Sequence, residues 1–515
     1  MPKILLIHTP KFHDRFEASG DMMFVNVVAN GLFSVGGYLR LYGYDVRILH
    51  LGVEWIKAVS GGLSDSSCGG AGVDTSGAGL DPCGFAQKFE PDLAGFSLQW
   101  HHQSYDVVES ARKLKERFPD VPVVLGGLTA AYFAREIMEN FDFIDFIIAG
   151  DGEVPMRMLA DQLTGGAEPD FELIPGLYYR KDGVIIEPSC RYEMTQDVFE
   201  KLDYCCFDLM EDFEFYRDSI GIPAIWLKNM SIRDNRERIE KMRKIFFPVA
   251  GKGCPHNCTW CGRERRRKML SKSVTVVVDS IKRAIGQGME FLYMTYDACP
   301  RTGDYYIELF REMKREGIDV PVYFESWGLP DEAFFRAFKE SFSDGVIGLS
   351  PESACEKIRT MNGRPSISNE DLYKTLKITD ELNIETDLFF CAGLPGENRQ
   401  FFAETENMIS YIQDNFKCVS LVRAFALLME PGAPWFENPG KFGIVSNIKD
   451  FMDFYRMHSP EGKGSYNAMG YYIPGYFGEG VAEDVDSFET EILKMTAGGK
   501  NPLAFCVVNR ENETA

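Results

Sequence analysis

Short apolar runs alternate with amphipathic helical stretches along the first 165 residues. The runs have the length of strands, are rich in β-branched residues and are almost continuously apolar, as in strands that are buried on both faces of a parallel sheet. This pattern predicts an α/β fold with a doubly wound parallel sheet, in which ligands bind at the carboxyl ends of the strands. We predict strands at Lys3–Ile7, Val46–Leu51, Leu93–Ser97, Val121–Leu125 and Phe146–Ala149, and helices at Gly31–Tyr42, Tyr105–Arg117, Ala130–Asn140 and Val154–Leu163.

A second alternation of strands and helices begins at Lys244. Six strand–helix repeats fit a partial (β/α)6 barrel that is open on one side, with its active site at the carboxyl ends of the strands. The predicted strands are Ile245–Val249, Phe291–Tyr296, Val320–Trp327, Gly345–Leu349, Ile384–Cys391 and Val419–Ala426, and the predicted helices are Val274–Gly286, Tyr305–Glu316, Asp331–Lys339, Asn369–Leu382 and Phe401–Asp414.

The pattern is weaker elsewhere, and it divides the chain into four parts. We expect a first domain over residues 1–165, a connector over 166–243, the partial barrel over 244–430 and a small C-terminal region over 431–515. Within these parts, Pro175–Gly183 predicts a hairpin, Gly61–Gly84 a flexible surface insertion, and the aromatic segment Tyr466–Phe477 either core or a cover over the substrate.

Composition narrows the classes of function. The 515 residues carry 77 Asp and Glu against 55 Lys and Arg, a net charge of −22, and so acidic a surface repels nucleic acid and anionic membranes. No apolar run is long enough to span a bilayer, and the chain opens directly on a predicted strand rather than on a signal peptide. We therefore expect a cytoplasmic protein whose 13 cysteines are reduced thiols. The adjacent Cys205 and Cys206 are expected to be ordinary core.

Three cysteines form the sharpest chemical signal in the chain. Cys254, Cys258 and Cys261 lie within eight residues, on the loop that follows the first strand of the predicted barrel. Three thiolates can hold three irons of a cubane cluster and leave the fourth iron open for catalysis. A structural zinc site, which needs four ligands, is the alternative, with His256 as the fourth candidate. The spacing favours the cluster.

This spacing, Cys-x-x-x-Cys-x-aromatic-Cys with Trp260 as the aromatic residue, resembles the signature of the radical S-adenosylmethionine (radical SAM) enzymes. The resemblance implies a 4Fe–4S cluster whose open iron binds S-adenosylmethionine, and a reducing electron donor. It also implies cleavage of S-adenosylmethionine to a 5′-deoxyadenosyl radical. Further segments at the ends of predicted strands resemble the family's S-adenosylmethionine site, and the residues they suggest are Trp260, Tyr296, Asp297, Glu352, Ser353, Gly393 and Pro395.

The first domain resembles the cobalamin-binding domain that precedes some radical SAM barrels. The resemblance rests on the order and spacing of several glycine-rich segments, among them Leu125–Gly127 and Ile148–Glu153. It implies that bound cobalamin meets Ser97, Gln99, Trp100, His101, Gly126, Gly127, Gly150, Gly152 and Glu153. The Asp-x-His-x-x-Gly sequence that supplies a histidine to cobalt in other cobalamin proteins is absent. We expect Trp100 to cover the lower face of the corrin, with His101 as the alternative.

Together the two resemblances imply a cobalamin-dependent radical SAM methyltransferase that methylates an unactivated carbon. The substrate would be a small molecule or a peptide or protein side chain, with the side chain marginally preferred. Two alternatives stay open: a radical SAM enzyme that binds cobalamin but catalyses a ring closure, rearrangement or oxidation, and an iron–sulfur electron-transfer or sensor protein. A methylthiotransferase is disfavoured, because the first domain has no second cysteine triad.

Overall fold

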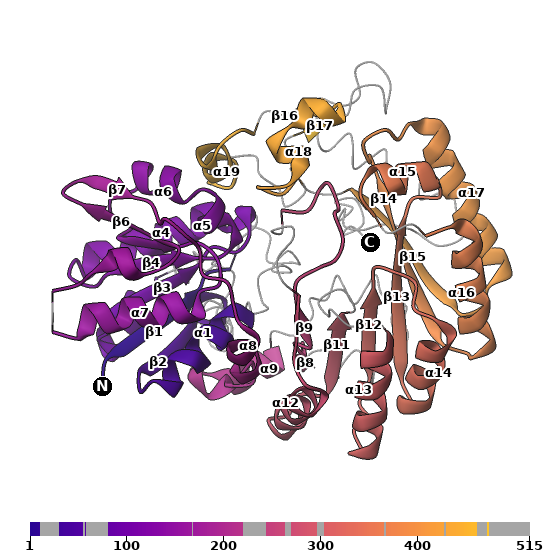
Figure 1. Ribbon diagram of the computed structural model, residues 1–515, viewed down its shortest axis with the longest axis horizontal. Coiled ribbons are helices and arrows are strands. Elements are labelled where there is room, and N and C mark those ends of the chain that lie inside the picture. Colours follow the sequence, from indigo (N-terminus) through magenta and orange to yellow (C-terminus); the bar gives the residue numbers. More distant parts are fainter. Residues whose placement is uncertain are drawn as a thin grey trace, which may run out of the picture. The chain divides into compact units, whose positions relative to one another are not determined.

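The computed structural model describes residues 1–10, 30–54, 57, 81–166, 168–219, 241, 244–262, 269–295, 303–364, 367–426, 429–446, 448–460 and 471–472. The chain forms two compact units. The first comprises residues 1–223 and 448–466, and the second comprises residues 224–447 and 467–515. Each unit is built around one large sheet (Figure 1).

The sheet of the first unit has the strand order β2-β1-β3-β4-β5-β6-β7. Its first five strands are mutually parallel and match the predicted ones: β1 (Lys3–His8), β2 (Asp45–His50), β3 (Leu93–Ser97), β4 (Val123–Gly126) and β5 (Phe146–Ile148). The order 2-1-3-4-5 is flavodoxin-like. It creates a topological switch point between β1 and β3, where such sheets bind their ligands.

Helices cover both faces of this sheet. α1 (Asn30–Leu41) packs against α7 (Glu153–Thr164), whereas α3 (Cys83–Phe89) packs against α4 (Ser104–Arg117). Because parallel crossovers are right-handed, reversal of the winding at the switch point sends these pairs to opposite faces. The helix expected over Ala130–Asn140 is interrupted at Phe133 and forms α5 (Leu128–Tyr132) and α6 (Ala134–Asn140).

The segment expected to connect two domains instead extends the first sheet. Its predicted hairpin forms β6 (Leu177–Lys181) and β7 (Val184–Ile186), which continue the sheet antiparallel to β5. Cys205 and Cys206 are 3% and 1% exposed, which confirms them as core. The other elements of this segment are η3 (Phe171–Leu173), α8 (Gln196–Lys201), η4 (Phe207–Leu209) and α9 (Phe213–Ser219).

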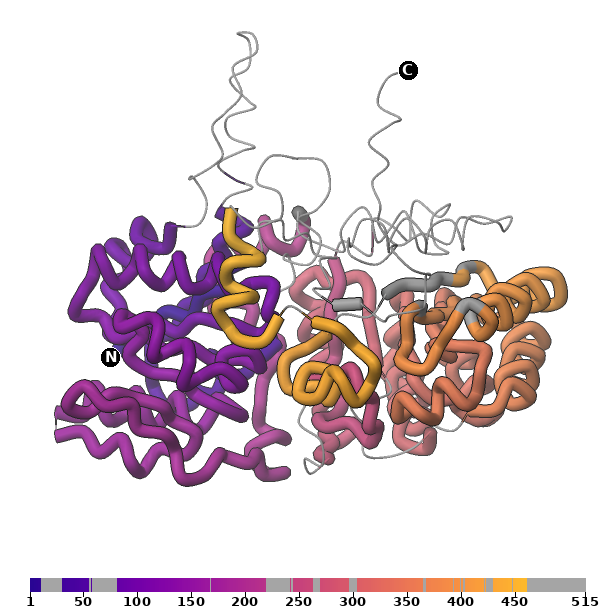
Figure 2. Tube along the Cα trace, turned by 90° about the horizontal axis from the view of Figure 1, so that it is seen from above, coloured from indigo at the N-terminus to yellow at the C-terminus, as the bar shows by residue number. Residues whose placement is uncertain are grey.

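A helix from near the end of the chain also belongs to the first unit. α19 (Phe451–Met457) packs against α4 and against the short helix η2 (His101–Gln103), as the position of the yellow tube beside the purple helices shows in Figure 2. The backbone N–H of Met452 donates to Glu136 Oε1 over 3.2 Å, and the Tyr455 hydroxyl donates to Glu109 Oε1 over 2.6 Å. Residues more than 300 positions apart in the chain are therefore packed in one core.

The second unit contains a six-stranded sheet in the order β15-β14-β13-β12-β11-β8, and every neighbouring pair is parallel. The predicted strands and helices recur with small changes at their ends, and one further short helix, Glu356–Met361, was not predicted. The strands are β8 (Ile245–Phe246), β11 (Phe291–Thr295), β12 (Val322–Ser326), β13 (Gly345–Glu352), β14 (Glu385–Ala392) and β15 (Val419–Ala426); the helices are α12 (Val274–Gly286), α13 (Gly303–Arg315), α14 (Glu332–Ser341), α15 (Glu356–Met361), α16 (Asn369–Glu381) and α17 (Arg399–Asn415).

The two faces of this sheet differ in character. On the face that the helices cover, Phe324 of β12 packs edge-on against Phe310 of α13 and lies 5.0 Å from Phe334 of α14. Neighbouring residues of a strand point to opposite faces. Tyr323 and Glu325 therefore lie on the face that points away from these helices, which we call the inner face. The aromatic core therefore lies under the helices, and the inner face is left for polar chemistry.

Short elements complete the second unit. β9 (Gly251–Lys252) pairs with β10 (Leu270–Ser271) on either side of the cysteine loop, and β16 (Val445–Ser446) pairs with β17 (Tyr471–Tyr472). α18 (Pro434–Glu437) and η6 (Pro439–Phe442) follow the last strand of the large sheet. Most of the aromatic segment Tyr466–Phe477 and of the insertion Gly61–Gly84 lies outside the described residues.

Candidate cofactor sites

The cysteine loop follows β9 and begins at Gly253, whose φ of 100° requires glycine. Cys254, Cys258 and Cys261 are reduced thiols and partly exposed. The N–H of Cys261 donates to the carbonyl of Cys258 in a tight turn. Three reduced thiols on one accessible loop are suitable ligands for a cubane cluster. Among the described side chains, no group of three or more His, Cys, Asp or Glu residues is placed to hold a single metal ion.

Side chains from later in the chain hold this loop in place. The N–H of Thr259 donates to the carbonyl of Asn362, and the Trp435 indole donates to Thr259 Oγ1 over 2.8 Å. The N–H of Gly262 donates to Glu430 Oε2 over 2.9 Å. The Trp260 ring lies 5.9 Å from that of Trp435. Sequence reasoning missed Asn362, Glu430 and Trp435, since no local motif marks residues that act at such a distance along the chain.

A buried ion pair lies beside the second cysteine. Arg364 Nε donates to Glu352 Oε2 over 2.6 Å, and Arg364 Nη1 lies 3.8 Å from Cys258 Sγ. The two charged side chains are 4% and 9% exposed. Burial raises the pKa of Glu352 to about 7, against the lowering effect of Arg364. Burial also raises the pKa of Cys258, and the Arg364 charge again opposes it.

The backbone at Glu352 is unusual. Glu352 has a φ of 59° at the end of β13, where the pairing with β14 shifts register between Leu349 and Glu352. A non-glycine residue in this left-handed region costs free energy, and such strain concentrates at functional sites. The bulge aims the Glu352 carboxylate at Arg364 rather than along the regular alternation of the strand.

A second carboxylate organises the loop after β14. Glu397 Oε2 accepts hydrogen bonds from the N–H groups of Gly393 and Leu394, and the Ser353 hydroxyl donates to Glu397 Oε1 over 3.3 Å. The side chain of Asn362 donates to the carbonyl of Pro395 over 3.0 Å. Glu397 therefore joins Ser353 to Gly393, and Asn362 joins Pro395 to the cysteine loop. Ser353, Gly393 and Pro395 are all predicted to meet S-adenosylmethionine.

Polar side chains follow the inner face of the six-stranded sheet. The Tyr293 hydroxyl and the Trp327 indole both donate to the Glu325 carboxylate, over 2.6 and 3.1 Å. The Tyr323 hydroxyl donates to Asp387 Oδ2 over 3.0 Å, and the rings of Tyr293 and Tyr323 stack at 5.2 Å. Glycine at position 348 makes room for this cluster, since a Cβ there would lie 2.8 Å from the Tyr323 hydroxyl. Sequence reasoning did not single out these residues, because strand alternation marks a face but not its chemistry.

In the first unit, the predicted cobalamin residues lie at the carboxyl edge of the sheet. The loops after β1 and β3 meet at the switch point, where Gln103 Nε2 donates to the carbonyl of Thr9 over 2.8 Å. The loops after β3 and β4 are also joined, by the hydroxyl of Thr129 donating to the carbonyl of Gln99. Ser97 ends β3 and Gly126 ends β4, so both lie at this edge.

The two glycines at the end of β4, Gly126 and Gly127, serve different purposes. Gly127 has a φ of 108°, and a Cβ at this position would lie 2.5 Å from the carbonyl oxygen of Leu98. Gly126 faces open space, because no atom lies within 4 Å of the position that a Cβ would occupy. Gly127 therefore allows two loops to pack closely, whereas Gly126 leaves the room that a ligand beside the sheet needs.

The two candidates for the lower face of the corrin differ in their surroundings. Trp100 is 38% exposed at the carboxyl end of β3. The ring of His101 is buried and lies 4.5 Å from Phe454 and 5.7 Å from His458, both from the C-terminal segment. Its exposure makes Trp100 the better candidate to cover the lower face of the corrin, whereas His101 packs against α19.

The glycine-rich segment after β5 is partly structural. Glu153, the first residue of α7, is 5% exposed and accepts a hydrogen bond of 2.7 Å from the Ser34 hydroxyl of α1. Asp151 Oδ2 accepts from the N–H of Met194. Gly150 has a φ of 112°, and Gly152 precedes the helix. The Glu153 carboxylate thus joins two helices, which sequence reasoning did not foresee.

Two predicted residues, Tyr296 and Asp297, lie outside the described part of the chain, as does the basic run Arg263–Lys268.

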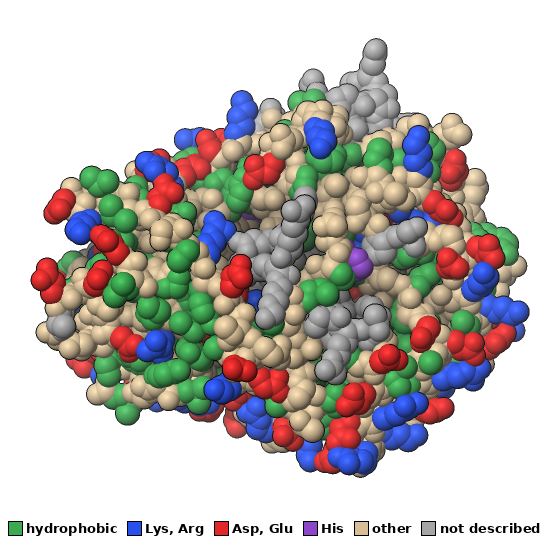
Figure 3. All heavy atoms as spheres, viewed as in Figure 1, with side chains coloured by type: hydrophobic (Ala, Val, Ile, Leu, Met, Phe, Trp, Pro, Cys, Tyr) green, Lys and Arg blue, Asp and Glu red, His purple; other side chains and the backbone are tan. Residues whose placement is uncertain are grey.

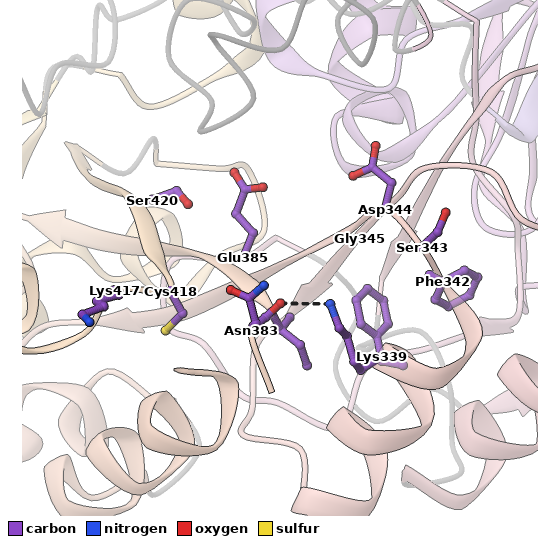
Figure 4. A pocket seen from close by; sticks show the side chains of 12 residues that line it. Lys339, Phe342, Ser343, Asp344, Gly345, Asn383, Glu385, Lys417, Cys418 and Ser420 are labelled. Carbon is purple, nitrogen blue, oxygen red and sulfur yellow. Dashed lines mark hydrogen bonds between the residues drawn. The ribbon is translucent and has the colours of Figure 1, made fainter. Parts of the chain in front are cut away.

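A cavity of about 360 Å³ lies at the opposite end of the six-stranded sheet (Figure 4). Its lining includes residues that precede or begin three strands, among them Asp344, Glu385 and Cys418. In parallel α/β folds, active sites form at the carboxyl ends of strands. The cavity is therefore distinct from the site around the cysteine loop.

The outer surface agrees with the charge balance of the sequence. On the face shown in Figure 3, acidic and basic side chains are interspersed, without a continuous basic area. Among the helices of the described segments, none combines the length and the hydropathy that crossing a membrane requires.

Comparisons with known proteins agree with this geometry. The B12 binding domain family matches residues 25–160, and the Radical SAM superfamily matches residues 249–409. The fold is similar to that of TsrM from Kitasatospora setae, a radical S-adenosylmethionine methyltransferase solved with cobalamin and a 4Fe–4S cluster bound. The TM-score is 0.66 at 14% identity, over 100% of this chain and 94% of that one.

Two curated relatives differ in their stated activity. An uncharacterized methyltransferase of Pyrococcus horikoshii is 22% identical over 63% of this chain and 72% of its own length. The anaerobic magnesium-protoporphyrin IX monomethyl ester cyclase of Synechocystis sp. is 27% identical over 45% of this chain, and only 37% of its own length is covered.

The chain belongs to the cobalamin-binding radical SAM enzymes, since both of the domains that define them are present in order. Its cofactors are accordingly a 4Fe–4S cluster, S-adenosylmethionine and cobalamin. The residues present fit these groups. The cysteine loop offers three reduced thiols, one of them beside a buried guanidinium, and the edge of the first sheet offers open space at Gly126.

Proposed function

We propose that this enzyme is a methyltransferase that transfers a methyl group to an unactivated carbon. The observation that carries the proposal is the presence, in one chain, of a B12 binding domain and a radical SAM domain in a fold similar to that of a methyltransferase. When bound, the three cofactors supply one-electron reduction, hydrogen abstraction and a transferable methyl group.

The chain's own residues bind and orient these groups. Cys254, Cys258 and Cys261 ligate the cluster, which an external electron donor reduces. The cysteine loop, and the strand ends that carry Glu352 and the Gly393 turn, would hold S-adenosylmethionine between them. This assignment is supported by the hydrogen bonds through Arg364, Glu397 and Asn362 that join these segments. The proposed ligands of S-adenosylmethionine are Trp260, Tyr296, Asp297, Glu352, Ser353, Gly393 and Pro395.

Cobalamin occupies the carboxyl edge of the first sheet at its switch point. Gly126 would leave room for the corrin tail, and Trp100 would cover the lower face of the corrin. Close backbone packing around Gly127 holds the edge in shape before the ligand arrives, which lowers the cost of binding. The full set of proposed contacts is Ser97, Gln99, Trp100, His101, Gly126, Gly127, Gly150, Gly152 and Glu153.

The substrate is a small molecule or a peptide or protein side chain, and the reaction takes place in the cytoplasm. A second structure of TsrM, with tryptophan substrate bound, supports a substrate of this size. The polar inner face of the six-stranded sheet, with Glu325 and Asp387, supports a substrate that carries hydrogen-bond donors.

Products of S-adenosylmethionine test the proposal. The enzyme is incubated with S-adenosylmethionine that carries a deuterated methyl group, a low-potential reductant, and a panel of amino acids and peptides. We expect S-adenosylhomocysteine together with 5′-deoxyadenosine, and deuterium in a product. If 5′-deoxyadenosine and an altered compound from the panel form while no deuterium leaves the methionine methyl group, the non-methylating alternative, which similarity to a cyclase favours, replaces methyl transfer.

A further inference from the structure

Arg364 is a buried cation that joins segments of the proposed site, but the proposed function gives its charge no role. It follows α15, in the segment Asn362-Gly363-Arg364, and its side chain is 4% exposed. Desolvating a guanidinium costs several kcal/mol, on the order of the penalty for any buried ion, unless partners compensate it. Arg364 therefore needs partners that compensate its charge.

Four contacts account for the orientation of its guanidinium. Nε donates to Glu352, and Nη2 donates to the carbonyls of Trp327 and Ser350, each over 2.9 Å. Nη1 then points at Cys258 Sγ over 3.8 Å. The planar fork of arginine allows this set of directions, and lysine, with one nitrogen, cannot reproduce it.

The partners lie on three different segments. Trp327 follows β12, Ser350 and Glu352 end β13, and Cys258 belongs to the cysteine loop. Three of the four bonds fix the guanidinium from the side of the sheet, so its contact with the sulfur is held in place rather than sampled by a mobile surface side chain. Nη1 is therefore held in a fixed position beside Cys258 Sγ.

A fixed positive charge beside a cluster sulfur has a definite electrostatic consequence. Reduction adds one negative charge to the cluster, and a nearby cation with an N–H···S hydrogen bond stabilises the reduced form. The effect is large where water is excluded, because the local dielectric constant is low. Glu352, the counter-ion, limits the effect, so the reduction potential depends on both members of the pair.

We propose that Arg364 is a positioning residue that raises the reduction potential of the cluster through its contact with Cys258, and that Glu352 counterbalances it. The inference rests on the proposed assignment of Cys258 as a cluster ligand. Arg364 acts through the sulfur and is not itself a ligand of the cluster.

Redox titration of the reconstituted enzyme, followed by electron paramagnetic resonance under anaerobic conditions without S-adenosylmethionine, tests the proposal. Arg364→Gln removes the charge, and we expect the midpoint potential to become more negative. At a fixed potential the ratio of reduced to oxidised cluster should fall about tenfold, which is about 59 mV for a one-electron couple. Glu352→Gln leaves the cation uncompensated, so the midpoint should move in the opposite direction.

Arg359→Gln is the matched control. Arg359 is also an almost fully buried arginine. It donates to the carbonyls of Ser353 and Ile367 and to Asn369 Oδ1, and none of these bonds reaches the described part of the cysteine loop. We expect lower stability of this variant but an unchanged midpoint. Arg364→Lys should restore part of the potential, since it keeps the charge but not the fork.

Opposite shifts in Arg364→Gln and Glu352→Gln support the proposal. An unchanged midpoint in Arg364→Gln, or shifts of the same sign in both variants, overturns it. If Arg364→Gln takes up no cluster, the Glu352→Gln midpoint decides: a positive shift supports the proposal, and no shift or a negative one overturns it. Iron content is measured separately, and iron that survives loss of Cys258 would refute the cysteine assignment instead.

Discussion

At the scale of single residues, neighbouring positions of similar type have different roles. Gly126 and Gly127 are adjacent and equally plausible as ligand contacts from sequence. One faces open space, and the other is required by its φ of 108° and by the carbonyl of Leu98. The same contrast separates Trp100, whose ring is partly exposed, from His101, whose ring is buried against the C-terminal segment.

This contrast predicts different outcomes for two alanine substitutions. Gly127→Ala should lower the free energy of unfolding by about 1–3 kcal/mol or more, because alanine cannot adopt this backbone conformation cheaply. Gly126→Ala should change it by no more than about 0.5 kcal/mol, while weakening cobalamin binding through the added methyl group. Urea unfolding and absorbance titration with cobalamin measure the two effects. Equal destabilisation by both substitutions would contradict the assignment.

At the scale of elements, the strands and helices were predictable, whereas the contacts between distant segments were not. Apolar periodicity located the six strands of the second sheet, because parallel strands buried on both faces leave a local signal. The contact of Arg364 with Cys258 spans 106 residues, and no local pattern encodes it. The break of the expected helix at Phe133 was missed for a related reason, since the packing of the folded chain overrides local helical propensity.

α19 is an element whose role depends entirely on such distant contacts. Phe454, 1% exposed, lies against His101 of the loop after β3. Phe454→Ala should cost about 3–5 kcal/mol of stability, as truncation of a buried phenylalanine does. It should also raise the dissociation constant for cobalamin about tenfold, if disordering of the loop after β3 costs about 1.4 kcal/mol of binding free energy.

The control for this prediction lies on the same helix. Arg456 is exposed, and its ion pair with Asp453 is worth little. Arg456→Ala should therefore leave both thermal unfolding and cobalamin affinity near those of the unaltered enzyme. Unchanged cobalamin affinity in folded Phe454→Ala protein would show that α19 does not position the loop after β3.

At the scale of the whole molecule, the chain combines two parallel folds, each with its ligand-binding loops at the carboxyl ends of its strands. The fold class and the order of the two domains were predictable from the sequence, and the domain comparisons confirm them. The participation of residues 448–466 in the first unit was not, because only the folded chain brings that segment to α4. The proposed cluster and cobalamin sites are formed by different units, so substitutions can remove one cofactor without the other.

Metal analysis of the anaerobically purified enzyme, produced with cobalamin supplied, tests the central claim most directly. We predict one four-iron cluster and one cobalt per chain. Replacement of Cys254, Cys258 and Cys261 by alanine should remove the iron and leave the cobalt, whereas Cys355→Ala, at a partly exposed thiol outside the triad, should keep both. Iron without cobalt, or iron that persists when the triad is gone, would contradict the account.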